Sequence, residues 1–296
     1  MIIVKLWGGL GNQMFQYAAA RRLAHVNAEV LKLDTRWFGK EAPGDTARRY
    51  ELDVFTLVAD NAAADDSDRL RGRDTRRWPK IVKRLMNGIG YAVPSSYITE
   101  KHFHFNPEIL QITGDAYLDG YWQSEKYFRD AAEIIRSDFQ LVAEPQGMNR
   151  ETLTMIEESN SVSIHVRRGD YITNASAAAY HGTLPLDYYH AALQTVQERV
   201  ENPHLFVFSD DPGWVKDHLQ TSLPVVYVEG NGARSASEDL RLMSVCKHHI
   251  VANSSFSWWG AWLGSARDSV VVAPERWFSD QVINTADLVP EGWLRL

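Results

Sequence analysis

Cysteine is almost absent from this chain of 296 residues, because Cys246 is the single one. A lone cysteine excludes an intramolecular disulfide and any zinc site built from several thiolates. Long apolar runs are missing too, since nowhere do about 18 apolar residues follow one another, the length that a membrane-spanning helix needs. Near the N-terminus Lys5 interrupts the apolar run too early for a signal-peptide core. We therefore expect a cytoplasmic protein.

Positive charge is also scarce, because 31 lysines and arginines stand against 38 aspartates and glutamates, giving a formal net charge of -7. Such a chain is not expected to bind duplex nucleic acid through bulk charge. Residues 69–84 are an exception, and two interpretations stay open for them: a solvated face, or peripheral contact with anionic lipid at the inner membrane. The basic residues of this run are Arg69, Arg71, Arg73, Arg76, Arg77, Lys80, Lys83 and Arg84.

Several catalytic signatures are missing. The sequence has no P-loop, no G-x-S-x-G elbow and no H-E-x-x-H helix, which disfavours a kinase, an esterase or a metalloprotease. No metal site is predicted, because the candidate ligands lack metal-binding spacing or lie outside any strand end. These candidates are His102 with His104, Cys246 with His248 and His249, and the pair Asp66 and Asp68.

The pattern that is present alternates short β-branched runs with stretches of helical period, which is typical of parallel-sheet α/β proteins. Strands are predicted at residues 2–7 and 29–33, with a helix from Asn12 between them. A second series follows at residues 162–166, 204–209, 225–229, 250–252 and 270–273. We therefore predict two Rossmann-like domains, 1–148 and 149–296, that face each other across a cleft. Ligands of such sheets lie at the carboxyl ends of the strands.

The first motif places two adjacent arginines, Arg167 and Arg168, directly after a buried strand. Guanidinium groups match phosphate oxygens, and two of them are able to neutralise a diphosphate. Gly169 lets the backbone turn, and Asp170 is expected to hold a neighbouring side chain. The alternative is an exposed loop whose arginines pair with nearby carboxylates.

Two further strand ends carry polar groups. Ser209 and Asp210 are expected to contact hydroxyl groups of a ribose or another sugar. The alternative for Ser209 or Asp211 is that its side chain caps the helix that starts near Pro212.

The other strand end is followed by Asn253, Ser254, Ser255, Phe256 and Ser257, at the start of a predicted helix. Phosphate binding and capping are compatible there. Helical spacing indicates that Trp258, Trp259 and Trp262 pack in the core.

The N-terminal segment contains Gly8, Gly9, Gly11, Asn12 and Gln13 between a strand and a helix. With Asp34 after the next strand it is similar to a dinucleotide fingerprint, but Met14 stands where the third glycine belongs. The segment is expected to let a ligand approach the backbone closely. A nicotinamide-dependent dehydrogenase therefore stays an alternative. A non-catalytic glycan-binding protein is another, suggested by 10 tryptophans and 12 tyrosines.

Together, residues 8–18 (GGLGNQMFQYA), 165–171 (HVRRGDY), 208–211 (FSDD) and 253–263 (NSSFSWWGAWL) resemble the bacterial α1,2-fucosyltransferase family. The resemblance implies a GT-B fold, GDP-β-L-fucose as donor, inversion at the anomeric carbon and no required metal or other cofactor. The implied acceptor is the 2-hydroxyl of a terminal β-galactoside in a surface glycan or O-antigen unit. Residues 39–117 carry no part of the resemblance, and the oligomeric state is not predicted.

The resemblance also implies roles for individual residues. Arg167 and Arg168 would contact the GDP phosphates, and His165 and Asp170 would shape that pocket, with Asp170 either a base or a carboxylate that orients Arg168. Further donor contacts would come from Ser209, Asp210 and the segment from Asn253 to Ser257. Guanine recognition is assigned to Glu238, Asp239 or His249, and the loop of Gly9, Gly11, Asn12 and Gln13 would face donor and acceptor.

Overall fold

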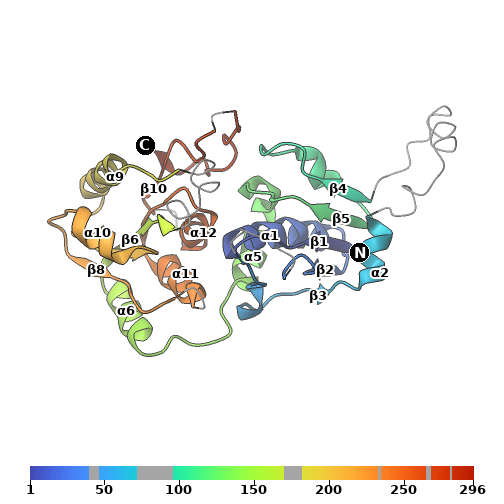
Figure 1. Cartoon of the computed structure of the whole chain (residues 1–296), viewed down its shortest axis with the longest axis horizontal. Helices are drawn as coiled ribbons and strands as arrows, with labels where there is room; N and C mark the ends of the chain where they lie inside the picture. Colours follow the sequence, from blue (N-terminus) through green and yellow to red (C-terminus); the bar gives the residue numbers. More distant parts are fainter. Residues whose placement is uncertain (40–46, 72–95, 170–181, 233–234, 265–267, 281) are drawn as a thin grey trace. The chain divides into compact units, whose positions relative to one another are not determined.

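The computed structural model describes residues 1–39, 47–71, 96–169, 182–232, 235–264, 268–280 and 282–296 (Figure 1). The chain divides into two compact units, Met1–Gln140 and Leu141–Leu296. Residues 141–148, which the sequence analysis placed in the first domain, lie in the second unit. The reason is local bonding: the Ala143 carbonyl accepts from Arg241, and the Pro145 carbonyl accepts from Arg150.

The first unit is built on a sheet with strand order β3-β2-β1-β5-β4, as far as the structure describes it. Neighbouring strands pair in parallel. The strands are β1 (Ile2–Lys5), β2 (Leu31–Asp34), β3 (Asp60–Asn61), β4 (Tyr97–Thr99) and β5 (Ala116–Asp119). The helices are α1 (Leu10–Val26), α2 (Ala64–Leu70) and α5 (Ala132–Asp138), with short 3-10 turns at Leu52–Val54, Pro107–Gln111, Glu125–Tyr127 and Arg129–Ala131. The predicted β1, α1 and β2 are confirmed.

The second unit is built on a sheet with strand order β11-β10-β9-β6-β7-β8 in the described residues, again with parallel pairing. Its strands are β6 (Asn160–Val166), β7 (Pro203–Ser209), β8 (Val225–Tyr227), β9 (His248–Ile250), β10 (Val271–Ala273) and β11 (Leu294–Arg295). Its helices are α6 (Met148–Glu157), α9 (Leu186–Arg199), α10 (Pro212–His218), α11 (Ala236–Val245) and α12 (Ser255–Gly264). All predicted strands of this half are present, whereas β11 was not predicted.

Helix α12 is the most apolar packing element of the second unit. Trp258 and Trp259 are fully buried, Trp262 is nearly so, and the Trp258 Nε1–H donates to the Leu288 carbonyl at 2.9 Å. The helix packs closely on α11, because a Cβ added at Gly260 would lie 2.9 Å from the Met243 Cβ. The prediction that these tryptophans are core residues is therefore confirmed.

No helix in the described ranges is long and apolar enough to span a membrane. Residues 72–84 of the predicted basic surface, and Asp170 of the arginine motif, fall outside the described residues. The interpretations attached to them stay predictions.

Candidate functional site

The arginine pair lies at the carboxyl end of the central strand of the second sheet. Strand β6 pairs with β7 over its full length, and Val166 is opposite Ser209 in the register. The residues that follow these strands therefore meet at one edge, and Arg167, Arg168 and Asp210 lie at the carboxyl ends of strands, as the sequence analysis predicted. The Ser209 hydroxyl reinforces this edge, since it donates to the Val166 carbonyl at 2.9 Å and accepts from the Asp211 N–H at 3.0 Å.

Asp210 organises the turn that carries the arginines. One carboxylate oxygen accepts from the Arg168 N–H at 2.8 Å, and the other accepts from the Gly169 N–H at 3.0 Å. The second oxygen also pairs with the Arg167 guanidinium at 2.9 Å. Gly169 leaves room for this carboxylate, because an added Cβ would lie 2.6 Å from Asp210 Oδ2. Asp210 thus fixes the turn by its geometry and balances part of its positive charge.

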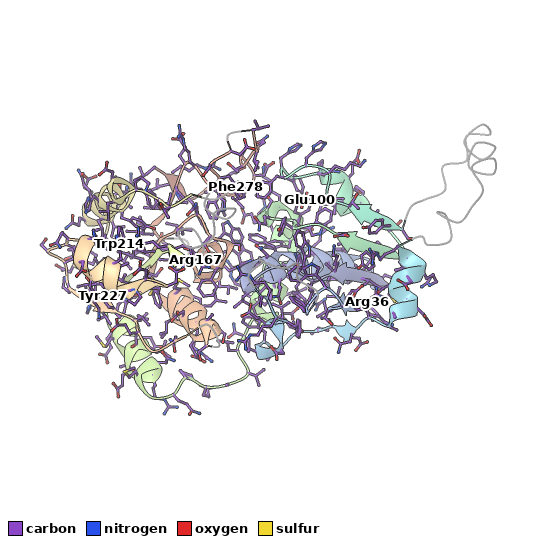
Figure 2. All side chains as sticks on the ribbon, viewed as in Figure 1. Arg36, Glu100, Arg167, Trp214, Tyr227 and Phe278 are labelled. Atoms are coloured by element: carbon purple, nitrogen blue, oxygen red, sulfur yellow. The ribbon has the colours of Figure 1, made fainter. Side chains whose placement is uncertain are left out.

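Arg168 is held from a second side by α10. Its Nε lies 3.3 Å from Asp211 Oδ2, and its guanidinium carbon stands 3.5 Å from the centroid of the Trp214 ring. Asp211 also caps α10, since its side chain accepts from the Trp214 N–H, which confirms the capping interpretation. Figure 2 shows Arg167 and Trp214 in the second unit. A guanidinium stacked on an indole keeps its in-plane N–H donors directed sideways, where a phosphate is able to bind them.

Both guanidinium groups stay partly open to solvent, with side-chain exposures of 27% for Arg167 and 19% for Arg168. His165, two residues before Arg167, is by contrast buried, and its Nδ1 has no hydrogen-bond partner among the described residues. Burial lowers the pKa of His165 to about 4, with Arg167 adding to the lowering and Asp210 opposing it. The imidazole is therefore neutral at pH 7 and adds no charge to the site.

The start of α12 lies beside this edge, because the Phe256 ring stands 5.7 Å from the His165 ring. The Ser254 carbonyl accepts the first helical hydrogen bond from the Trp258 N–H, which makes Ser254 the N-cap residue, directly before Ser255. Asn253 and Ser257 bind the protein's own backbone. The Asn253 amide donates to the Gly182 and Trp277 carbonyls, and the Ser257 hydroxyl accepts from the Ala252 N–H. The N-terminus of this helix, through its dipole, is the part suited to an anion.

The three predicted guanine contacts differ in their surroundings. Glu238 pairs with Arg241 at 3.0 Å, and His249 is buried with its Nδ1 2.8 Å from the Ser163 hydroxyl. Asp239 instead accepts only from the Asn231 amide, at 2.9 Å, among the described residues. Burial raises the pKa of Asp239 to about 6, and Glu238 raises it further against the Asn231 hydrogen bond. A partly buried carboxylate of this kind suits a ligand that brings N–H donors.

In the first unit, the glycine segment forms the turn from β1 into α1. Gly8 has a φ of +78°, which favours glycine, and Gly9 is the N-cap residue of α1, while Gly11 is buried in its first turn. The Asn12 side chain accepts from the Gln123 amide at 2.7 Å. Gln13 is fully buried and serves the fold, because it donates to the Gly8 and Arg49 carbonyls and accepts from the Glu51 N–H.

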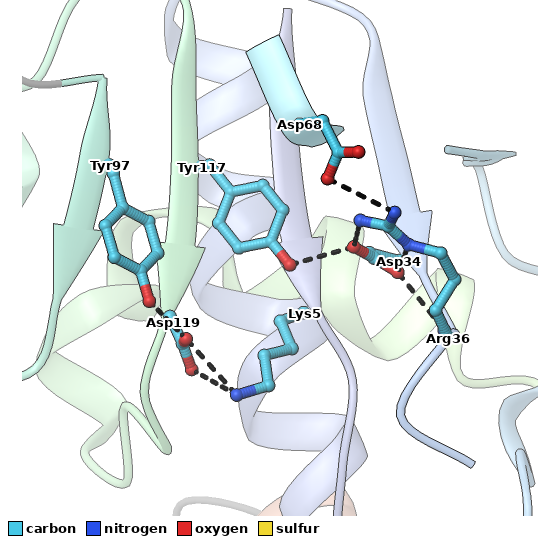
Figure 3. Close-up of polar contacts among 7 residues, drawn as sticks. All are labelled: Lys5, Asp34, Arg36, Asp68, Tyr97, Tyr117 and Asp119. Carbon is cyan, nitrogen blue, oxygen red and sulfur yellow. Dashed lines mark hydrogen bonds and ion pairs between the residues drawn. The ribbon is translucent and has the colours of Figure 1, made fainter. Parts of the chain in front are cut away.

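A polar network on the first sheet, shown in Figure 3, was not predicted from the sequence. Asp34 is nearly fully buried, and its carboxylate accepts from Arg36 at 2.6 Å and from the Tyr117 hydroxyl at 2.8 Å. Although burial raises it, these hydrogen bonds lower the pKa of Asp34 to about 2. Asp34 is thus engaged within the sheet, which removes the ribose contact on which the dehydrogenase alternative depended. Beside it, Lys5 pairs with Asp119 at 2.9 Å.

Three contributors to these edges were missed by the sequence analysis. Trp214 was not predicted as the partner of Arg168, because a stacked pair between a turn and a helix leaves no periodic pattern. Glu100 follows β4 within residues 39–117, where no motif was found, and Tyr121 follows β5 just after that segment. Among the described residues, no group of three or more His, Cys, Asp or Glu side chains is placed to hold a metal ion.

Comparison with known proteins identifies the family. Residues 93–296 match glycosyl transferase family 11. The chain is 34% identical to an alpha-1,2-colitosyltransferase of Escherichia coli, covering 100% of this chain and 99% of that protein. It is 33% identical to the O-antigen biosynthesis glycosyltransferase WbnK of Escherichia coli, covering 98% and 99% of the two chains.

Among solved structures, a mutant of Arabidopsis thaliana FUT1 in complex with GDP matches with a TM-score of 0.51 and 11% identity, covering 95% of this chain and 72% of that one. This likeness shows the fold, and with the two parallel-sheet units it confirms the predicted GT-B class. The sequence matches confirm the resemblance to the α1,2-fucosyltransferases that the four motifs indicated. The chain therefore belongs to glycosyl transferase family 11.

Proposed function

We propose that this glycosyltransferase moves L-fucose from GDP-β-L-fucose to the 2-hydroxyl of a terminal β-galactoside in a surface glycan or O-antigen unit, with inversion. The observation that carries the proposal is the arginine pair at the end of β6, fixed by Asp210, Asp211 and Trp214. Groups that are fixed before the reaction pay no reorganisation cost when charge develops beside them.

The proposed chemistry follows from where charge appears. As the bond from fucose C1 to the β-phosphate oxygen breaks, the sugar becomes oxocarbenium-like and negative charge grows on GDP. Arg167 and Arg168 donate to that diphosphate, and the N-terminus of α12 adds its N–H groups and its dipole. These groups supply the positive charge for which other transferases use a divalent ion, so no metal is required.

The remaining donor contacts are assigned on the same basis. Asp239 is proposed to accept the N1–H and N2–H of guanine, because Glu238 is already paired with Arg241 and His249 with Ser163. Asn253, Ser257 and Ser209 hold the backbone that presents the site. The second unit is thus the donor side and the first unit the acceptor side, with the turn at Gly9, Gly11, Asn12 and Gln13 among its parts.

GDP-colitose is a second candidate donor, favoured by the relative that is 34% identical over the whole chain. Colitose differs from fucose in lacking the 3-hydroxyl, so the two donors share the diphosphate and guanosine contacts. A site that hydrogen-bonds the 3-hydroxyl rejects the deoxy sugar strongly, whereas a site that leaves it in solvent does not.

Calorimetry and a transfer assay test the proposal. GDP and GDP-fucose are expected to bind, whereas UDP and NADH are not, and lactose with GDP-fucose in EDTA is expected to give 2′-fucosyllactose. Arg168→Ala should abolish transfer, while the matched Arg168→Lys, which keeps the charge without the planar guanidinium, should retain only part of the parent activity.

Binding of NADH without binding of GDP would refute the proposal. Faster transfer from GDP-colitose than from GDP-fucose would show that GDP-colitose is the preferred donor. Loss of activity in EDTA would contradict metal independence alone.

A further inference from the structure

Glu100 is a carboxylate at the end of β4 whose surroundings the fold alone does not explain. It is partly buried, and no cation pairs with it among the described residues. Its two oxygens accept from backbone N–H groups instead: Oε2 from Tyr121 at 2.7 Å and Oε1 from Trp122 at 3.0 Å. Removing a carboxylate from water without a counter-charge costs stability, so such groups gather at functional sites.

The turn beneath Glu100 is shaped around it. A Cβ added at Gly120 would lie 2.4 Å from the Glu100 Cβ, so only glycine leaves room for this side chain. Trp122, two residues later, has a φ of +58°, a conformation that costs a non-glycine residue on the order of 1–2 kcal/mol. The chain therefore tolerates a strained turn and an unneutralised carboxylate at the same place. Figure 2 marks Glu100 just beyond strand β4.

Glu100 follows the edge strand β4, and its two hydrogen bonds reach the turn after β5, next to the point between β1 and β5 where the strand order of the first sheet reverses. From β1 the chain continues to β2 and β3 on one side, while β5 and β4 lie on the other. In parallel sheets, ligands bind at the carboxyl edge at this switch point. There the Trp7 and Tyr121 rings lie 4.0 Å apart, and the Gln123 to Asn12 hydrogen bond joins the turns that follow β5 and β1. Partly exposed aromatic rings beside a few polar groups are the surroundings that hold a sugar ring.

We propose that Glu100 accepts the proton of the attacking acceptor hydroxyl, and that the Trp7 and Tyr121 rings hold the acceptor sugar beside it. This inference rests on the proposed function. In the step, the acceptor oxygen forms a bond to fucose C1, and the bond from C1 to the β-phosphate oxygen breaks with its electron pair leaving on GDP. The hydroxyl proton moves to the Glu100 carboxylate and later to water. No other reactant is needed.

The ionisation of Glu100 suits this role. Burial raises its pKa to about 7, and the Tyr121 and Trp122 N–H groups only partly oppose the rise. The titratable neighbours are Asp119 and Tyr121 on the β5 side and the exposed Lys101 and His102 that follow Glu100, and the charge of none of these side chains contributes to the shift. A base with a pKa near the working pH is both deprotonated and strong enough to take a proton.

Glu100→Gln separates the inference from the proposed function. Transfer to lactose is expected to fall by about 10²–10⁴-fold, the usual contribution of a general base. GDP binding and the slow hydrolysis of GDP-fucose without acceptor should persist, because neither needs Glu100. In the unaltered enzyme, kcat/KM for lactose should rise through about pH 7, and this limb should be missing in the variant. Glu108→Gln, at an exposed carboxylate of the same unit, is the matched control and should behave as the parent enzyme.

The aromatic part has its own comparison. Tyr121→Ala is expected to raise KM for lactose, whereas Tyr121→Phe, which keeps the ring, should not.

If Glu100→Gln does not fold, Glu100→Asp replaces it in the test. This variant should transfer fucose more slowly and keep the pH-dependent rise of kcat/KM. Unchanged transfer and an unchanged limb in the Glu100 variants would overturn the inference while leaving the proposed function intact. Absence of GDP binding in the parent enzyme would overturn both.

Discussion

Asp210 does more in the donor site than its place after a strand suggests, because one carboxylate holds two backbone N–H groups and the Arg167 guanidinium. Asp210→Asn keeps one acceptor oxygen and loses the charge. Since hydrogen bonds to charged groups contribute about 1.5–3 kcal/mol, we expect kcat/KM for the donor to fall roughly tenfold to a hundredfold. Steady-state kinetics with GDP-fucose measures this.

The control for that measurement is Asp217→Asn, an exposed carboxylate on the neighbouring helix α10. It changes the net charge by the same amount at a position outside the site. Equal losses in both variants would mean that Asp210 acts only through the overall charge, and no loss in Asp210→Asn would show that the turn does not need the carboxylate.

His249 predicts how stability depends on pH. Burial lowers its pKa in the folded protein to about 3, from an ordinary value of 6.5. Between these values the unfolded chain binds a proton that the folded chain does not, so the free energy of unfolding rises with pH from about 3 to about 6.5. His249→Asn should reduce this slope by about 1.4 kcal/mol per pH unit at most. Urea unfolding at a series of pH values measures the slope, and an identical slope in the variant would contradict the prediction.

At the scale of elements, the sequence was informative where strands are buried and continuous. Residues 162–166 and 204–209 are apolar runs, and their parallel pairing brings the polar residues after them to one edge. The sequence placed Arg167 and Asp210 at such strand ends, whereas their ion pair was expected only under the alternative in which the arginines pair with nearby carboxylates. Strands β3 and β4 have only two and three residues, too few to produce a period, which explains why Glu100 was missed. The place of Asp34 in a network was missed because its partner Tyr117 is 83 residues away and reaches it only in the folded sheet.

Helix α12 allows a prediction that separates packing from sugar binding. Trp258→Phe removes the hydrogen bond to the Leu288 carbonyl and part of the buried ring, so the free energy of unfolding should fall by about 1–3 kcal/mol. KM for lactose and for GDP-fucose should stay unchanged, because the indole is fully buried. Denaturant unfolding and kinetics measure the two effects. An increase in KM for lactose at unchanged stability would assign this ring to the acceptor.

For the whole molecule, the two units carry different kinds of site. The second presents fixed cationic groups and a helix N-terminus at its sheet edge, which suits the diphosphate of a nucleotide sugar. The first presents an aromatic pair beside a partly buried carboxylate, which suits a neutral saccharide. We therefore expect the nucleotide sugar to order the sheet edge of the second unit and the acceptor saccharide to order the sheet edge of the first.

Hydrogen exchange shows which unit each substrate orders, because ligands protect the backbone amides that they order from exchange. GDP is expected to slow exchange in peptides covering residues 160–169, 209–214 and 253–258, all in the second unit. Lactose, added with GDP, should further protect residues 7–13 and 98–104 together with 119–124, in the first unit. Arg168→Ala should remove the GDP effect without changing exchange in the first unit. Protection by GDP alone that is strongest in the first unit would contradict the assignment, because the donor would then bind away from Arg167 and Arg168.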